Sequence, residues 1–170
     1  MTEKEFQNTI LPLAKQVYSF ALNMIGNNDD AADITQEVMI KVWDKRKESI
    51  RIGNRKAWIL KITRNLCLDW LKKHKPAYDE ELMTRNQVYD TDLLRQIEVR
   101  DTALAVRKII DTLPDSQREV MILREMEEME YDEIAQITGL GLNNIRVLLS
   151  RGRAKVKEIL VKQYRISKYE

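Results

Sequence analysis

The segment that decides the fold runs from Tyr131 to Arg153 and reads YDEIAQITGLGLNNIRVLLSRGR. It predicts a helix, a tight turn and a second helix. Ala135 is small where two helices would cross closely, and Gly139, four residues later, supplies the positive φ that such a turn needs. Ile145 returns apolar surface to the crossing six residues further on. The remaining inward positions are expected at Ile134, Leu140 and Leu148. The pattern is typical of a helix-turn-helix unit.

The second helix of such a unit enters the major groove of DNA, and residues near its N-terminus contact base edges. The residues expected to contact bases are Asn143, Asn144, Arg146 and Val147. Those expected to contact phosphates are Arg151, Arg153 and Lys155. An αα-hairpin in which the glycine only ends a helix is the alternative. The isoleucine at the crossing, together with the basic residues after it, favours DNA binding.

Charge is strongly segregated along the chain. The 170 residues carry 29 Lys+Arg against 27 Asp+Glu, a net charge of +2. Residues 45–75 nevertheless have a net charge of +9 and residues 146–169 a net charge of +7, whereas residues 112–145 have a net charge of −6. Clustered Lys and Arg favour phosphate binding through counterion release. Two separated basic segments therefore indicate two points of contact with one polyanion.

Helical periodicity extends over both halves of the chain. Apolar residues repeat every three or four positions from residue 6 to 24 and again from 31 to 43. A third helix is expected from residue 55 to 73, with an inward stripe formed by Trp58, Ile62, Leu66 and Trp70. No sustained stripe follows Pro76 until Leu104. We therefore predict an all-α protein of two small helical domains, 1–75 and 101–170, joined by a linker over 76–100.

Several function classes are disfavoured. Cys67 and His74 are the only residues of their types and cannot form a structural zinc site, so no metal is expected. No Gly-rich phosphate loop and no nucleophile–histidine arrangement is present, so neither a cofactor nor catalysis is expected. Catalysis by an unusual pair of carboxylates, one acting as acid and one as base, stays open as an alternative. No apolar stretch approaches the ~20 residues of a membrane span, so we expect no membrane insertion and a cytoplasmic location.

Further motifs lie on both sides of the expected linker. The first half contains AADITQEVMIKVW at 31–43 and WILKITRNLCLD at 58–69, and the second half contains LPDSQREV at 113–120 and RGR at 151–153. In this order, and with the helix-turn-helix, the chain resembles the extracytoplasmic-function (ECF) sigma factors of bacterial transcription. The stretch from Asn143 to Ser150 is similar to versions from Bacteroidetes.

The resemblance implies a function and partners. An ECF sigma factor binds core RNA polymerase through the beta-prime clamp and beta flap and recognises promoter DNA, and an anti-sigma factor commonly regulates it. Its region 2 opens the minus-ten element, and its region 4 reads the minus-thirty-five element. The residues implied for polymerase binding are Asp33, Gln36 and Glu37. Those implied for the minus-ten element are Arg55, Lys56, Lys61, Arg64, Asn65 and Lys72. The minus-thirty-five residues are Asn143, Asn144, Arg146, Val147, Arg151 and Arg153.

The loop 46–54 matches the part of the family that captures a base flipped from the minus-ten strand. It contains no aromatic residue, and Ile50 stands where family members often have one. A base pocket is therefore favoured over an aromatic wedge.

Two alternatives stay open. One is a polymerase-independent regulator that binds a palindrome as a dimer, although no coiled-coil heptad is visible and the first 75 residues would then have no role. The other is a self-occluded form of the sigma factor, in which the acidic segment 112–145 packs near the basic segment 45–75.

Overall fold

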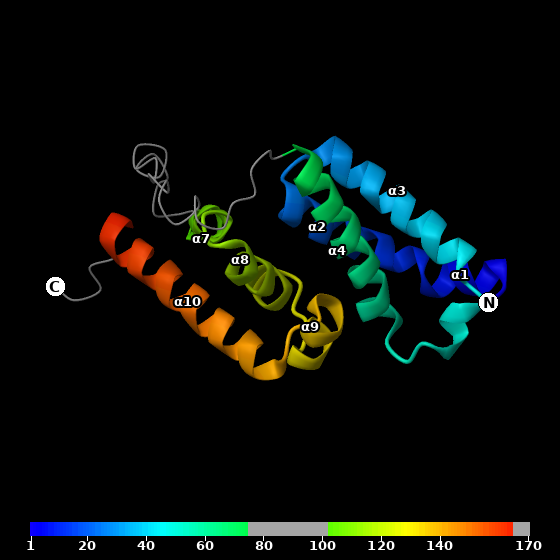
Figure 1. Cartoon of the computed structure of the whole chain (residues 1–170). Helices are drawn as coiled ribbons and strands as arrows, with labels where there is room; N and C mark the ends of the chain where they lie inside the picture. Colours follow the sequence, from blue (N-terminus) through cyan, green and yellow to red (C-terminus); the bar gives the residue numbers. More distant parts are fainter. Residues whose placement is uncertain (75–101, 165–170) are drawn as a thin grey trace. The chain divides into compact units, whose positions relative to one another are not determined.

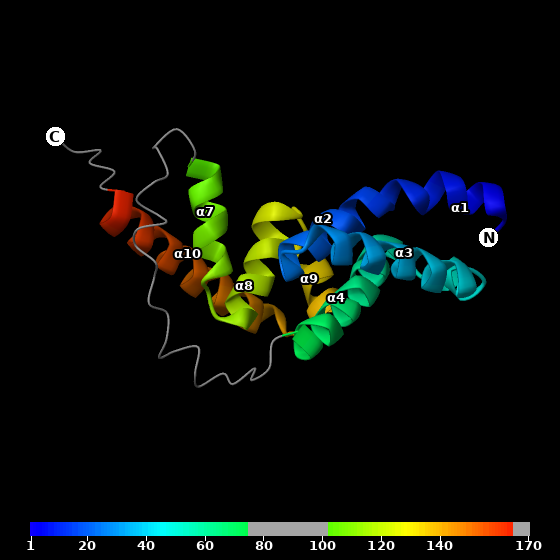
Figure 2. The same ribbon diagram turned by 90° about the horizontal axis from the view of Figure 1, so that it is seen from above.

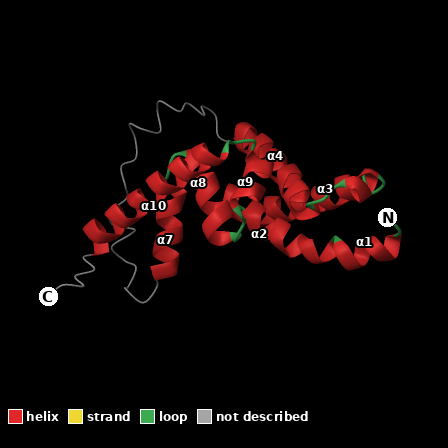
Figure 3. Ribbon diagram, turned by 90° about the horizontal axis from the view of Figure 1, so that it is seen from below, coloured by secondary structure: helices red, strands yellow, loops and turns green. Residues whose placement is uncertain are grey.

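The computed structural model describes residues 1–74 and 102–164 (Figure 1). Within these two ranges every regular element is helical and no strand is present (Figure 3), which confirms the predicted all-α class. The elements before the gap are α1 (Glu3–Thr9), η1 (Leu11–Leu13), α2 (Ala14–Ile25), α3 (Asn28–Asp44), η2 (Glu48–Arg51) and α4 (Arg55–His74). Those after it are α7 (Thr102–Asp111), α8 (Asp115–Met121), the π-helical turn η4 (Ile122–Met126), α9 (Tyr131–Thr138) and α10 (Leu142–Tyr164).

The described residues form two compact units. The first unit combines residues 1–74 with residues 122–142, and the second combines residues 102–121 with residues 143–164. The predicted linker, 76–100, lies outside the described residues. The division into domains 1–75 and 101–170 stays a prediction.

In the first unit, α2, α3 and α4 pack around one apolar core. Phe20, Val38 and Val42 are fully buried there. Gly26 ends α2 in the left-handed region with φ 72°, a conformation in which an L side chain is strained. Asn27 then caps α3, because its side-chain oxygen accepts a hydrogen bond from the Asp30 N–H at 3.0 Å.

The buried stripe of α4 differs from the predicted one. Trp58, Ile62, Leu66 and Trp70 are only half-buried. The buried side chains are Ala57, Ile59, Leu60, Thr63, Cys67 and Leu71. Residues spaced strictly by four turn about 40° per step around a helix with 3.6 residues per turn, so they leave any single face within three steps. The steps of three and four from residue 60 to 71 stay within about 80° of one another, and that face meets the core.

In the second unit, α8 and α10 approach each other closely at Gly152. This glycine is buried, and a Cβ atom built on it would lie 2.8 Å from Met121 Cγ and 3.1 Å from Met121 Sδ. The middle residue of the RGR motif is therefore a packing position. Its neighbours Arg151 and Arg153 are both exposed.

Candidate nucleic-acid and polymerase interfaces

The outer face of α3 carries the residues expected to bind polymerase. Asp33, Gln36 and Glu37 are exposed and share one face with Ile40, whose side chain is 60% exposed. Glu37 forms an ion pair with Lys41 at 3.4 Å, one helical turn on. A carboxylate and amide face around an exposed isoleucine suits a protein partner better than a phosphate backbone. Sequence reasoning missed Ile40, although its spacing from Asp33 and Glu37 places it on their face.

The exposed face of α4 carries four of the six residues predicted for the minus-ten element. Lys61, Asn65 and Lys72 are exposed, and half-buried Arg64 lies beside them at helical spacing. This set of four is called the α4 cationic face below. Helical spacing puts Arg55 and Lys56 on other sides of the helix. The structure therefore groups four of these candidates and separates two.

Arg55 belongs to the loop that precedes α4. Its Nε donates a hydrogen bond to the Ser49 carbonyl oxygen at 3.3 Å. Ser49 is fully buried and its hydroxyl donates to the Arg46 carbonyl oxygen at 2.8 Å. The Arg46 guanidinium in turn lies over the Trp43 ring, 4.2 Å from its centroid. The loop is thus held by its own polar contacts, which leave Ile50 exposed.

A small open pocket lies between this loop and α1. Met1, Glu5, Thr9, Ile50 and Arg55 line it, and its volume is about 230 Å³. The hydrogen bond from the Thr2 backbone N–H to Glu5 Oε2, 2.7 Å long, holds the pKa of Glu5 below its ordinary value, and Arg55 lowers it further. The pocket therefore combines an anion, a cation and a hydroxyl with two apolar side chains. No sequence pattern indicated Met1, Glu5 and Thr9, because only the fold brings them beside residue 50.

Helix α9, a short turn and α10 follow one another as predicted. Gly139 ends α9 with φ 77°, and its N–H donates to the Ala135 carbonyl oxygen at 2.9 Å. Ile134 and Ile145 are fully buried, as expected. Leu148, expected to be inward, is only half-buried, and Leu149 is buried in its place. Steps of four from Ile145 select residue 149, which is why the inward position falls one residue later.

The residues predicted to read bases are all exposed on the first turns of α10. They are Asn143, Asn144, Arg146 and Val147. Arg146 donates to Asn143 Oδ1 at 3.1 Å, so these two side chains are already oriented toward each other. Val147 is 45% exposed and offers an apolar contact of the kind that suits a thymine methyl group.

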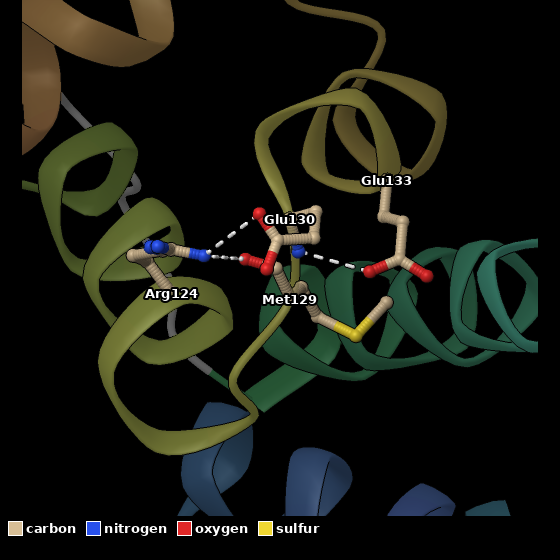
Figure 4. A network of polar contacts seen from close by, with 4 residues as sticks. All are labelled: Arg124, Met129, Glu130 and Glu133. Carbon is tan, nitrogen blue, oxygen red and sulfur yellow. Dashed lines mark hydrogen bonds and ion pairs between the residues drawn. The ribbon is translucent and has the colours of Figure 1, made fainter.

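A polar network shapes the turn that leads into α9 (Figure 4). Arg124 donates to the Met129 carbonyl oxygen at 2.8 Å and lies 3.5 Å from a Glu130 carboxylate oxygen. The Glu130 N–H donates to Glu133 Oε2 at 2.9 Å, which completes a capping box at the start of α9. The other carboxylate oxygen of Glu133 accepts a hydrogen bond from Asn54 Nδ2 at 3.0 Å. Asn54 also caps α4 by accepting from the Ala57 N–H at 2.9 Å.

Burial of Glu133 opposes ionisation, but hydrogen bonds and charge outweigh it. The Asn54 amide, the Glu130 backbone N–H and the nearby Lys56 ammonium together hold the pKa of Glu133 below its ordinary value of 4.5. Lys56, predicted to contact DNA, thus lies near an acidic residue of α9.

No group of three or more His, Cys, Asp or Glu side chains in 1–74 and 102–164 is placed to hold a metal ion. Of the helices in those ranges, none combines the length and apolar character that crossing a bilayer requires.

Comparison with known proteins agrees with this arrangement. Residues 10–76 match the family Sigma-70 region 2, and residues 103–156 match Sigma-70, region 4. The chain is 30% identical over 152 residues to the ECF RNA polymerase sigma factor SigE of Mycolicibacterium smegmatis, covering 88% of this chain and 59% of that protein. It is 30% identical over 157 residues to the ECF RNA polymerase sigma factor SigW of Bacillus subtilis, covering 85% of this chain and 83% of SigW.

A solved structure has a similar fold. The sigma factor RpoE of Bartonella quintana, determined in complex with the anti-sigma factor NepR, superimposes with a TM-score of 0.69 at 23% identity, over 92% of this chain and 97% of that chain. The region 2 match accounts for residues 10–76, most of the part that the dimeric-regulator alternative leaves without a role, so that alternative is not favoured. From the two region matches and the identity to SigW, the chain belongs to the ECF RNA polymerase sigma factors.

Proposed function

We propose that this ECF sigma factor binds core RNA polymerase and assigns the two promoter elements to two separate helices. Region 2, within 1–75, opens the minus-ten element. Region 4, within 101–170, reads the minus-thirty-five element, and 76–100 tethers the two. The observation that carries this division is the pair of exposed polar and basic faces, one on α4 and one on α10, within the two segments that match the two sigma regions.

Polymerase binding is assigned to the α3 face. Asp33, Gln36 and Glu37 surround Ile40, so one docking surface offers both hydrogen-bonding groups and an apolar centre. We assign this surface to the beta-prime clamp, and region 4 to the beta flap. The opposite side of α3 is buried in the first unit through Ile34, Val38 and Val42, which leaves the acidic side for a partner.

The minus-ten strand is assigned to the α4 cationic face and the pocket beside it. Lys61, Arg64 and Lys72 neutralise phosphates, and Asn65 offers a hydrogen bond. The pocket between α1 and the loop 46–54 receives the unstacked base, with Arg55 at its wall. An exposed Ile50 on the same wall adds apolar contact without an aromatic wedge.

The minus-thirty-five element is assigned to the first turns of α10. Asn143, Asn144, Arg146 and Val147 face base edges, and Arg151 and Arg153 contact phosphates. The stretch 143–150 is similar to versions from Bacteroidetes, and we propose that this recognition helix is of that type.

Three further properties follow from the same proposal. The factor performs no catalysis of its own, since RNA synthesis belongs to the polymerase. Its place of action is the cytoplasm, where core polymerase and promoter DNA are. An anti-sigma factor is a further partner, by analogy with the RpoE complex.

The test is run-off transcription from a genomic fragment library with core polymerase freed of other sigma factors. Discrete start sites that share two upstream elements are expected only when the protein is added. Arg146→Ala should reduce dependence on the upstream element, whereas Arg64→Ala should impair duplex opening and be tolerated on a pre-melted template. Equal loss from both substitutions on both templates would refute the division between α4 and α10. Failure to bind core at all would refute the sigma role.

A further inference from the structure

Residues 122–138, which lie in region 4, belong to the first unit together with the residues of region 2. Helix α9 lies against α4, and η4 lies against α2; both views of the ribbon show α9 beside α4 (Figures 1 and 2). The side chains of this segment that are completely buried are Ile122, Leu123, Met129, Ile134 and Ile137. Specific polar contacts accompany these buried side chains.

Glu127 is the central polar residue of this contact. It is 7% exposed, and its Oε1 accepts hydrogen bonds from Ser19 Oγ at 3.0 Å and Asn23 Nδ2 at 3.1 Å. Its backbone oxygen accepts from Gln16 Nε2 at 3.4 Å. A buried carboxylate is costly unless donors surround it, and here α2 supplies them. Asn54 and Glu133 add a second polar contact at α4.

Polar residues on α2 and a fixed turn in the opposing segment match each other in position. Gln16, Ser19 and Asn23 lie at spacings of three and four, so they form one row on α2. On the opposing segment, Glu128 adopts φ 55°, an uncommon conformation for a residue other than glycine, directly after Glu127. Arg124 fixes the same turn by its hydrogen bond to the Met129 carbonyl oxygen. The turn thus presents Glu127 and Met129 to α2, and Gln16 Nε2 also lies 4.0 Å from Met129 Sδ.

Chain geometry makes this docked arrangement incompatible with reading two promoter elements. Gly139, Leu140 and Gly141 are the only residues between α9 and α10, and three residues span at most about 11 Å. The base-reading residues begin at Asn143, so they stay close to the end of α9 whichever way α10 points. The minus-ten and minus-thirty-five elements are about 25 base pairs apart, roughly 85 Å at 3.4 Å per base pair. While α9 lies against α4, region 2 and the recognition residues cannot span that distance.

We propose that the row Gln16, Ser19 and Asn23 on α2 is a docking surface for residues 122–138 of the same chain, and that this docking holds the free factor in an inhibited state. Glu127 fastens the docked segment, and binding of polymerase and promoter separates it from α2. The inhibitory role rests on the proposed function, because it assumes that region 2 and region 4 must reach separate elements. The docking itself does not depend on that assumption.

The test uses Asn23→Asp, which changes one amide into a carboxylate of the same shape that faces Glu127. Two carboxylates then repel each other and one hydrogen bond is lost. Adding Glu127→Gln restores the hydrogen bond with the roles reversed, because the new amide at position 127 donates to the new carboxylate at position 23. Asn8→Asp is the matched control, since Asn8 is exposed on α1. Opening is measured in the full chain, without polymerase or DNA, as the thiol-labelling rate of Met129→Cys, placed in every protein compared.

Buried Cys67 in α4 serves as an internal reference for the integrity of region 2. Asn23→Asp should raise the labelling rate at position 129 by about ten-fold or more, the factor expected from losing one hydrogen bond to a buried charge, and leave Cys67 protected. The double variant should return the rate toward the original, and Asn8→Asp should leave it unchanged. Two results would overturn the docking. One is rapid labelling at position 129 in the protein that carries Met129→Cys alone, and the other is an equal rise in the labelling rates of both cysteines when Asn23→Asp is added.

Inhibition is then tested by run-off transcription with the natural Met129 and limiting sigma factor. Asn23→Asp should need less protein than the wild type for half-maximal transcript, because more of it is in the open form. Unchanged transcription in a variant shown to be open would overturn the inhibitory role. Absence of transcripts from every protein, wild type included, would refute the proposed function and the inhibition built on it, while the labelling rates would still report the docking.

Discussion

Replacement of Gly152 by alanine should destabilise the second unit, although alanine is the better helix former. Gly152 lies inside α10, and a Cβ atom there would lie 2.8 Å from Met121 Cγ, 3.1 Å from Met121 Sδ and 3.7 Å from Leu113 Cδ1. The first of these distances is far inside van der Waals contact. Because Cγ is the middle of the methionine side chain, relief requires the whole side chain to rotate within a buried site.

Two opposing contributions set the magnitude. Overpacking of a core by a methyl group costs about 1–3 kcal/mol. Gly to Ala inside a helix gains about 1 kcal/mol through propensity. The net expectation is a loss of about 1 kcal/mol, which lowers the Tm of a small domain by roughly 4–8 °C. Gly152→Val should cost more, since it adds two further methyl groups at the same contact and a β-branched side chain in a helix.

The assay is urea unfolding of the full chain followed by far-UV circular dichroism, with Ser150→Ala as the matched control. Ser150 is an exposed residue of the same helix, so its substitution should change stability by less than about 0.5 kcal/mol. Shortening the opposing side chain by Met121→Ala should cost less in the Gly152→Ala protein than in the wild type, because the added methyl group then fills the space.

A Gly152→Ala protein that is more stable than the wild type by about the propensity gain would refute this reasoning. It would mean that Met121 moves aside without cost. The glycine between Arg151 and Arg153 would then need a reason other than the contact of α8 with α10.

Three further outcomes are expected. Gly139→Ala should cost about 1–2 kcal/mol by backbone strain alone, since φ is 77° and no atom lies within 4 Å of the added Cβ; Gly141→Ala, also unobstructed but without a positive φ, should cost less in the same unfolding assay. Asn27→Ala should cost about 1 kcal/mol through loss of the α3 cap, measured by thermal melting. The folded-state pKa of Glu133 is depressed, so the stabilisation by its carboxylate is present above about pH 4.5 and is lost as the pH falls through the folded-state pKa. The urea midpoint of the wild type should therefore fall more steeply below pH 4.5 than the midpoint of Glu133→Gln. Parallel pH profiles would contradict that assignment.

Much of the helix-turn-helix could be predicted because its signals are local. Positive φ at Gly139 follows from the residue type and the length of the turn, and the structure confirms it. Exposure of Asn143, Asn144, Arg146 and Val147 likewise follows from their position on the first turns of a helix whose apolar residues, such as Ile145, point the other way. The burial of Leu149 in place of Leu148 is a shift of one residue, which depends on how the helix turns against its neighbours.

Helix α4 shows where local signals are insufficient. Its apolar residues outnumber those that one face can bury, so more than one face is a candidate for the buried one. The two tryptophans favoured the face through Trp58 and Trp70, which is only half-buried. Contacts with α2 and α3 select the stripe through Leu60 and Cys67. Helical spacing groups Lys61, Arg64 and Lys72 on one face, whereas the contact of α4 with α9 brings Lys56 near Glu133.

By itself, the sequence determined the helical class, the order of the two sigma regions and the exposed positions at the start of α10, because periodicity, caps and motifs act over a few neighbouring residues. Only the tertiary structure decided that Glu127 is a buried residue with donors on α2, that Gly152 makes room for Met121, and that α1 walls a pocket beside Ile50. Each of these is a contact between residues far apart in the chain. Burial depends on which surfaces pack together, and the charge or size of a single residue does not specify its partner.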